Sequence, residues 1–151
     1  MKILVATDGS ADAIAAARVA LDLLTEEVEI VLVTVVQDYE NPLEMSGGFE
    51  GPLVTPEEAE EEYQSQMTEG QRALEHTMTA LGRNVEVHLI PTDANPGHAI
   101  IDLANELHPD LMVLGNSAKG LFWRVFAGSV SDYVLHHTPC PLLFVPHRNH
   151  T

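Results

Sequence analysis

The sequence predicts an α/β protein with an open, five-stranded parallel sheet and helices on both of its faces. Three observations support this fold class. Five short apolar segments alternate with segments in which apolar residues recur at helical spacing. The longest apolar segment is continuous rather than alternating, which is typical of a strand buried on both faces of a parallel sheet. Small and polar residues directly follow the first and fourth apolar segments, at the position where such sheets bind ligands.

The first strand is expected at residues 3–6, where the run Ile-Leu-Val-Ala ends at Thr-Asp-Gly-Ser. Either Ser10 or Asp8 suits the N-cap of the helix that follows, because both side chains can accept a hydrogen bond from a free backbone N–H. The alanines of this helix indicate close packing on the sheet. Its expected buried face consists of Ala13, Ala17, Ala20, Leu21 and Leu24.

The second strand is expected over residues 28–36, which form the longest β-branched run. Residues 37–55 carry three glycines and two prolines, so we expect a loop over one end of the sheet. Thr55 and Pro56 then predict the start of a long helix, as a cap residue followed by proline in the first turn. We expect this helix to end near Leu81. The glutamates of residues 57–62 are interpreted as its solvent-exposed beginning rather than as a metal site.

The second half of the chain repeats the alternation. We expect a strand at 85–90, a loop at 91–97, a helix ending at His108, a strand at 111–114, a helix at 128–137 and a strand at 141–146. No internal repeat or linker divides the chain. We therefore expect a single domain over residues 1–147 and a C-terminal tail at 148–151.

The charge of the chain is strongly unbalanced, with 23 acidic and 7 basic residues and a formal net charge of −16. Such a chain repels nucleic acid and anionic membranes. There is no apolar run of about 20 residues and no signal-peptide pattern. The single cysteine, Cys140, cannot form an internal disulfide. We expect a cytoplasmic protein that binds neither nucleic acid nor membrane, with an acidic surface that reflects solubility or, less simply, a high-salt habitat.

A candidate anion-binding segment spans residues 110–131. An apolar strand stops at Gly115, small and polar residues follow, and a helix is expected to begin at Gly128 and Ser129. Small residues let backbone N–H groups approach a ligand, and a helix N-terminus carries about half a positive charge. If strands one and four are neighbours, this segment and Asp8 face one crevice.

Several segments together resemble the universal stress protein family over nearly the whole chain. They are ILVATDGS at 3–10, GHAI at 97–100, DLMVLG at 110–115, GSVS at 128–131 and CPLLFV at 140–145. The resemblance implies a Rossmann-like fold with the strand order 3-2-1-4-5. The ATP-binding branch of this family is marked by Gly, two residues, Gly, nine residues, then Gly-Ser or Gly-Thr, and Gly115, Gly128 and Ser129 match that spacing.

Ala118 stands where this motif has its middle glycine. Alanine keeps the backbone N–H, but positive φ would cost it about 1 kcal/mol or more. If the family's glycine is needed for its conformation, phosphate binding is weakened or the loop is reshaped. If it is needed only for close approach, a methyl group fits.

The resemblance also implies the site residues. It places the nucleoside near Ala6 and Asp8, and the adenine against Val35. Asp8 would accept a hydrogen bond from a ribose hydroxyl, although a helix cap explains it equally well. Ribose and phosphates would lie beside Gly115, Ser117, Ala118, Gly128, Ser129, Val130 and Ser131. The ligand would be ATP or another adenine nucleotide, with Mg²⁺ held through the phosphates.

Other site types fit the sequence poorly. Leu121 occupies the position of the lysine in a Walker loop. His136 and His137 would point about 100° apart on a helix and converge poorly on a metal ion. We find no candidate general base other than Asp8, so we expect no catalysis, or at most slow ATP hydrolysis.

The favoured function is a cytoplasmic stress-response or regulatory protein that binds ATP at the ends of strands one and four. It would act as a homodimeric switch, paired through the fifth strand, on an unknown protein partner. One alternative is a dimeric interaction module of the same fold that has lost nucleotide binding through Ala118. The other is a slow ATPase.

Overall fold

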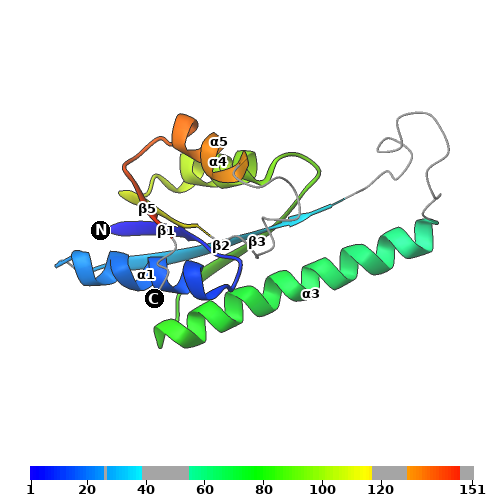
Figure 1. Cartoon of the computed structure of the whole chain (residues 1–151), viewed down its shortest axis with the longest axis horizontal. Coiled ribbons are helices and arrows are strands. Elements are labelled where there is room, and N and C mark those ends of the chain that lie inside the picture. Colours follow the sequence, from blue (N-terminus) through cyan, green and yellow to red (C-terminus); the bar gives the residue numbers. More distant parts are fainter. Residues whose placement is uncertain (26, 39–54, 117–128, 147–151) are drawn as a thin grey trace.

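The strands found in the computed structural model, which describes residues 1–25, 27–38, 55–116 and 129–146, agree with the predicted fold class. They are β1 (Lys2–Ala6), β2 (Glu29–Gln37), β3 (Glu86–Thr92), β4 (Leu111–Gly115) and β5 (Leu142–Val145). All pairings are parallel, and the order is β3-β2-β1-β4-β5 (Figure 1). The predicted order 3-2-1-4-5 is therefore confirmed. Residues 39–54 of the predicted loop and the predicted tail lie outside the described residues.

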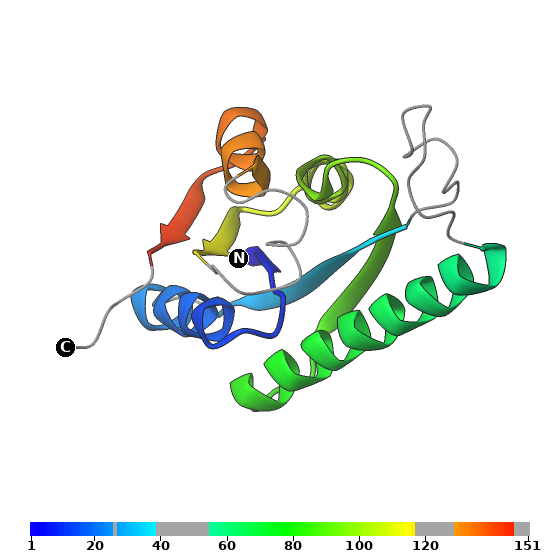
Figure 2. The same cartoon turned by 45° about the vertical axis from the view of Figure 1, so that its right-hand side comes forward.

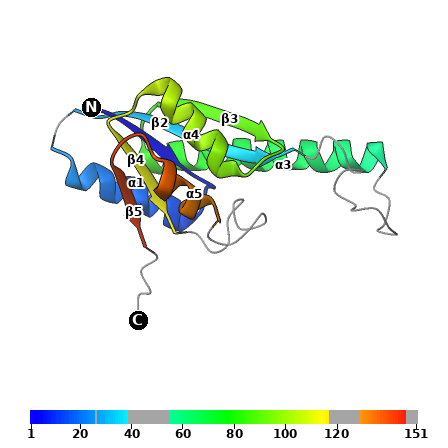
Figure 3. The ribbon, with the colours of Figure 1, turned by 90° about the horizontal axis from the view of Figure 1, so that it is seen from above.

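Helices cover both faces of this sheet. They are α1 (Ala11–Leu23), α3 (Pro56–Leu81), α4 (Pro96–Leu107) and α5 (Ser129–His137). Helices α1 and α3 lie on one face, and α4 and α5 lie on the other (Figure 2). The beginning of α3 projects beyond the sheet (Figure 3). No helix of the described residues is both long enough and apolar enough to cross a membrane.

Strand β2 illustrates how the sequence builds the two cores. Its side chains alternate between the faces, so that Val31, Val33 and Val35 pack towards α4 and α5, while Ile30 and Leu32 pack towards α1 and α3. All five are at most 4% exposed. Full burial of each such side chain contributes about 1.5–3 kcal/mol. A continuous apolar run was therefore the correct signal for a strand covered on both faces.

The start of α3 is defined by its local sequence. The Thr55 hydroxyl accepts a hydrogen bond from the Glu58 N–H, and the Glu58 carboxylate accepts one from the Thr55 N–H. The helix ends at Leu81, and its C-cap Gly82 has a φ of 67°. Both predicted ends of this 26-residue helix are thus confirmed.

The predicted loop at 91–97 is partly wrong. Strand β3 continues through Pro91 and Thr92, and α4 already begins at Pro96 with Asn95 as its N-cap. Proline usually ends a strand because it donates no ladder hydrogen bond. Strand β3 lies at the edge of the sheet, where that missing donor is tolerated.

Candidate functional site

The carboxyl ends of β1, β2 and β4 meet at one place. Ala6, the last residue of β1, pairs with Val33 on one side and with Leu114 on the other. The Thr7 N–H extends the ladder by donating to the Val33 carbonyl over 2.9 Å. The residues just after β1 therefore lie between the end of β4 and the last residues of β2, which continues to Gln37. This is the topological switch point at which open α/β sheets bind ligands.

The turn between β1 and α1 settles which residue caps the helix. The Ser10 hydroxyl accepts a hydrogen bond from the Ala13 N–H over 3.1 Å, so Ser10 is the N-cap. Asp8 Oδ1 accepts from the Ser10 N–H over 2.9 Å and shapes the turn instead. Gly9 has a φ of 76°, and a Cβ built on it would lie 2.8 Å from the Ala73 Cα. Glycine is thus required here for both conformation and space.

Asp8 has a second oxygen with no use inside the described residues. Asp8 Oδ2 is buried and has no hydrogen-bond partner there. A buried acceptor without a donor costs about 1–3 kcal/mol. Asp8 is not the N-cap and its contact within the turn uses only Oδ1, so Oδ2 is left to accept a hydrogen bond from a ligand.

Three buried threonines hold this turn in place. Thr7, Thr34 and Thr77 are each 0% exposed. The Thr34 hydroxyl donates to the Thr7 carbonyl over 2.7 Å, and the Thr77 hydroxyl donates to the Ala73 carbonyl over 2.8 Å. The Thr7 hydroxyl lies 2.7 Å from that of Thr77 and accepts from the Gly9 N–H over 3.1 Å. Because the Thr77 proton is already used, Thr7 donates to Thr77. This network ties the turn to β2 and α3.

Sequence reasoning missed the threonine network. Thr34 lies inside an apolar strand and Thr77 on the inner face of a helix, where an isolated hydroxyl needs a partner. A hydroxyl at a position expected to be apolar was the signal in the sequence that a buried hydrogen bond is present. It could not identify the partners, which come from three elements far apart in the chain.

Gly115 has a packing reason beyond turn geometry. A Cβ built on it would lie 2.8 Å from the Asp12 carbonyl oxygen and 3.2 Å from the Ala13 Cα. The end of β4 is thus pressed against the first turn of α1. The first motif glycine keeps the β4 backbone beside the turn that carries Asp8.

Some of the remaining predicted site residues lie in described elements of the fold, and the others lie outside the described residues. Ala6, Val35 and Val130 pack in the core under α4 and α5, at 4%, 2% and 6% exposure, and Ser131 is half-buried. Ser129 is the first residue of α5. The structure therefore brings Ala6, Asp8, Val35 and Gly115 to one end of the sheet. Ser117, Ala118 and Gly128 lie outside the described residues.

The paired histidines of α5 are engaged separately. The His137 ring stacks on Tyr133 at a centroid distance of 4.0 Å, and its Nδ1 lies 2.8 Å from the Tyr133 carbonyl. His136 Nε2 lies 3.4 Å from Asp132 Oδ1. In the described part of the chain, no group of three His, Cys, Asp or Glu residues is arranged to hold a metal ion.

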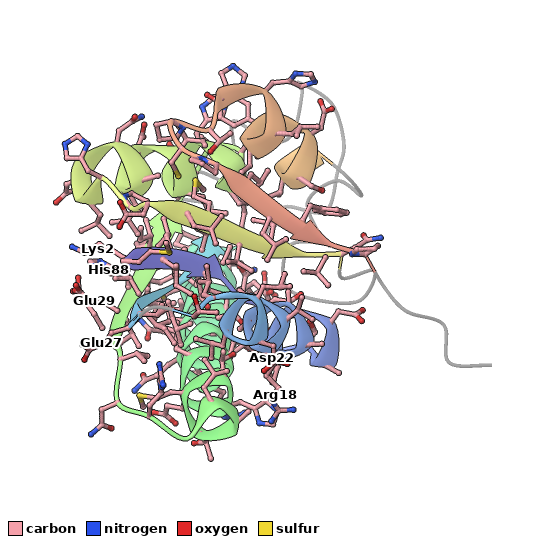
Figure 4. All side chains as sticks on the ribbon, turned by 90° about the vertical axis from the view of Figure 1, so that its left-hand side faces the viewer. Lys2, Arg18, Asp22, Glu27, Glu29 and His88 are labelled. Atoms are coloured by element: carbon pink, nitrogen blue, oxygen red, sulfur yellow. The ribbon has the colours of Figure 1, made fainter. Side chains whose placement is uncertain are left out.

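A hollow of about 560 Å³ lies at the opposite, amino end of the sheet, beside Leu24, Glu27, Arg83 and Glu86. Elsewhere at this end of the sheet, the Lys2 N–H donates to Asp110 Oδ2 over 2.7 Å. Figure 4 shows Lys2, His88, Glu29 and Glu27 along this end, with Arg18 and Asp22 on α1. Size alone does not make this hollow the better site, because none of the buried side-chain atoms that lack a partner in the described residues belongs to its lining.

Comparisons with known proteins match nearly the whole chain to one family. A model of the universal stress protein family matches residues 1–146. Universal stress protein MJ0531 from Methanocaldococcus jannaschii is 29% identical over 149 residues, which cover 95% of this chain and 81% of that protein. Universal stress protein Sll1388 from Synechocystis is 51% identical over 53 residues, an alignment that spans only 34% of either chain.

Solved structures agree in fold. A universal stress protein family member from Arabidopsis thaliana with AMP bound aligns over 98% of this chain and 92% of its own, with a TM-score of 0.64 and 20% identity. A universal stress protein in complex with cAMP aligns over 99% of this chain and 98% of its own, with a TM-score of 0.59 and 21% identity. At these identities the likeness shows the fold alone.

Proposed function

The chain belongs to the universal stress protein family, and we propose that it binds an adenine nucleotide beyond the carboxyl ends of β1, β2 and β4. The observation that carries this proposal is the buried, unpartnered Oδ2 of Asp8 at the switch point of the sheet. A ribose hydroxyl is a donor of the kind that this oxygen lacks. Relatives of the same fold have been solved with AMP and with cAMP.

In this proposal the nucleoside lies near Ala6 and Asp8, with the base against Val35. Val130 packs its side chain in the core, so it would meet a ligand through its backbone. Helix α5 starts at Ser129, and its first N–H groups favour an anion. ATP would bring Mg²⁺ through its phosphates. The residues assigned to ribose and phosphates are Gly115, Ser117, Ala118, Gly128, Ser129, Val130 and Ser131.

We also propose that the protein acts as a homodimer paired through β5. This strand is an edge of the sheet, and Phe144 on it is 42% exposed. An edge strand with an exposed aromatic side chain favours pairing with another chain. Leu135 on neighbouring α5 is 61% exposed and adds apolar surface. The nucleotide would then act as a switch for a protein partner, as a binding event rather than through turnover.

A second candidate function is favoured by Ala118. If the motif glycine is needed for its conformation, this protein is a dimeric interaction module that has lost its nucleotide. Calorimetric titration of the wild type with ATP, ADP and AMP in the presence of Mg²⁺ separates the two candidates. Ala118→Gly is the matched variant, because a gain of binding from none would support the interaction module.

Asp8→Asn tests the proposed site most directly. The amide keeps an oxygen for the Ser10 N–H but replaces the unpartnered acceptor with a donor. We expect affinity for adenine nucleotides to fall by about tenfold to hundredfold, while the fold persists. Glu29→Gln, at the other end of the sheet, is the control for loss of one acidic charge. Unchanged affinity in Asp8→Asn, or no binding by the wild type, would overturn the proposal.

A further inference from the structure

Gln37 occupies the carboxyl end of β2 on the face of the proposed base. The odd-numbered residues Val31, Val33 and Val35 of this strand pack towards α4 and α5. Strand side chains alternate, so Gln37, two residues beyond Val35, is on the same face. It therefore stands about 7 Å along the strand from the residue assigned to the adenine ring.

The orientation of the Gln37 amide is determined by its neighbour. Nε2 lies 3.4 Å from the carbonyl oxygen of Ala94. A carbonyl only accepts hydrogen bonds, so the NH₂ group must face it, and the reverse orientation would oppose two oxygens. Ala94 is itself held, because its N–H donates to the Thr92 hydroxyl over 3.2 Å.

The other end of the amide is a buried acceptor. Gln37 Oε1 is inaccessible and has no hydrogen-bond partner among the described residues. Among the side-chain atoms of the described residues, Gln37 Oε1 and Asp8 Oδ2 are the two that are buried without a hydrogen-bond partner. Extension of the β1–β2 register places Asp8 level with Val35. One unpaired acceptor thus lies in the turn that follows β1 and the other at the end of the neighbouring strand β2, about two residues or 7 Å further along the sheet. The base and the ribose of a nucleoside are separated by a similar length.

The chemistry of an acceptor selects among purine bases. Adenine carries a 6-amino group, which donates, whereas guanine and hypoxanthine carry a 6-oxo group, which accepts. A fixed acceptor would bind the first and repel the second. We propose that Gln37 Oε1 accepts a hydrogen bond from the exocyclic amino group of the base and makes the site selective for adenine over 6-oxopurines. This inference rests on the proposed nucleotide site.

The test compares ATP with inosine triphosphate, which differs at the 6 position of the base, by calorimetry. The wild type is expected to bind ATP about tenfold to hundredfold more tightly. Gln37→Met keeps the length of the side chain and removes its acceptor. This variant should lose a similar factor in ATP affinity and keep its affinity for inosine triphosphate within about twofold. Gln71→Met, on the exposed face of α3, is the control and should keep the full preference.

A second measurement needs only the wild-type protein. N6,N6-dimethyl-ATP has no 6-amino hydrogen, so it should bind as weakly as inosine triphosphate. Equal binding of all three ligands by the wild type, or an undiminished preference for ATP in Gln37→Met, overturns the role of Gln37 and leaves the nucleotide site standing. A wild type that binds no adenine nucleotide overturns the proposed function, and the inference with it.

Discussion

The two ends of the sheet satisfy their polar groups in different ways. At the amino end, the Lys2 N–H donates to Asp110 Oδ2, and the Asp110 N–H returns a bond to the Lys2 carbonyl. The chain N-terminus donates to the Glu27 carbonyl, and His88 pairs with Glu86. At the carboxyl end, Asp8 Oδ2 and Gln37 Oε1 are buried without partners in the described residues.

This contrast separates what stabilises the fold from what serves a ligand. Buried acceptors are nearly always paired in native proteins, so unpaired ones need a reason. The carboxyl end also contains Gly9, on which a Cβ would meet the Ala73 backbone, and a buried hydroxyl network that holds this turn. Local rules are most often broken at functional sites. The hollow at the amino end is therefore a weaker indication of function than two missing hydrogen bonds.

Gly9 and Gly82 allow the largest expected effect to be tested, because both have a positive φ but differ in their surroundings. Their φ values are 76° and 67°, but a Cβ on Gly9 meets the Ala73 backbone, and one on Gly82 meets nothing within 4 Å. We expect Gly9→Ala to lower the free energy of unfolding by about 2–4 kcal/mol, and Gly82→Ala by about 1–2 kcal/mol. Urea denaturation measures both. Equal losses would mean that the turn can shift to accommodate a Cβ on Gly9, and that its contact with the Ala73 backbone does not hold it in place.

The threonine network provides the second test. Thr77→Val keeps the shape of the side chain but leaves the buried Thr7 hydroxyl without an acceptor. We expect a loss of about 1–3 kcal/mol in unfolding free energy, together with weaker nucleotide binding, since the network positions the Asp8 turn. Thr68 is the control: its hydroxyl also donates to a carbonyl four residues earlier, but it is exposed. Thr68→Val should cost less than about 0.5 kcal/mol. If both variants behave alike, the network contributes nothing beyond a side-chain hydrogen bond to the carbonyl one helical turn earlier.

The sequence predicted most of the fold because its signals are local. The capping residues Ser10 and Thr55, the apolar run of β2 and the cluster at 110–115 act within a few residues of where they stand. Pro91 was misread since a proline signals the end of a strand unless the strand is known to be an edge. Edge status depends on strand order, which is a property of the whole sheet.

The site was predictable only in part for the same reason. The family resemblance indicated Asp8 and Gly115, and the structure brings them to one end of the sheet. It did not indicate that Ser10 rather than Asp8 caps α1, which leaves Oδ2 unpaired. From the sequence, Gln37 looked like the first residue of a polar loop. The contact that orients its amide, and so leaves Oε1 as a free acceptor, is made with Ala94, which is distant in the sequence.

Asp110 tests the amino end. Its carboxylate accepts from the Lys2 N–H in an exposed position, where water can replace it. We expect Asp110→Ala to lower the free energy of unfolding by about 1 kcal/mol and to leave nucleotide affinity unchanged. Chemical denaturation and calorimetry on one preparation report both quantities. A change in affinity would show that the two ends of the sheet are coupled. It would contradict the separation of a stabilising amino end from a ligand-binding carboxyl end.

The smallest effect is expected at the pair of Lys2 and Glu29, whose charged atoms lie 3.9 Å apart with side chains 31% and 62% exposed. An exposed ion pair contributes little to the free energy of unfolding. The net charge of −16 has a competing effect, because repulsion among the acidic residues destabilises the folded state. If the pair itself matters, Lys2→Met and Glu29→Gln both destabilise, by less than about 0.5 kcal/mol. If overall repulsion matters more, the two changes have opposite signs, because one removes a base and the other an acid. We expect opposite signs in dilute buffer and convergence in 1 M NaCl, where the Debye length is about 3 Å. Urea unfolding of both variants at low and high salt decides this, and a shared loss that persists in high salt would assign the amino end a specific ion pair.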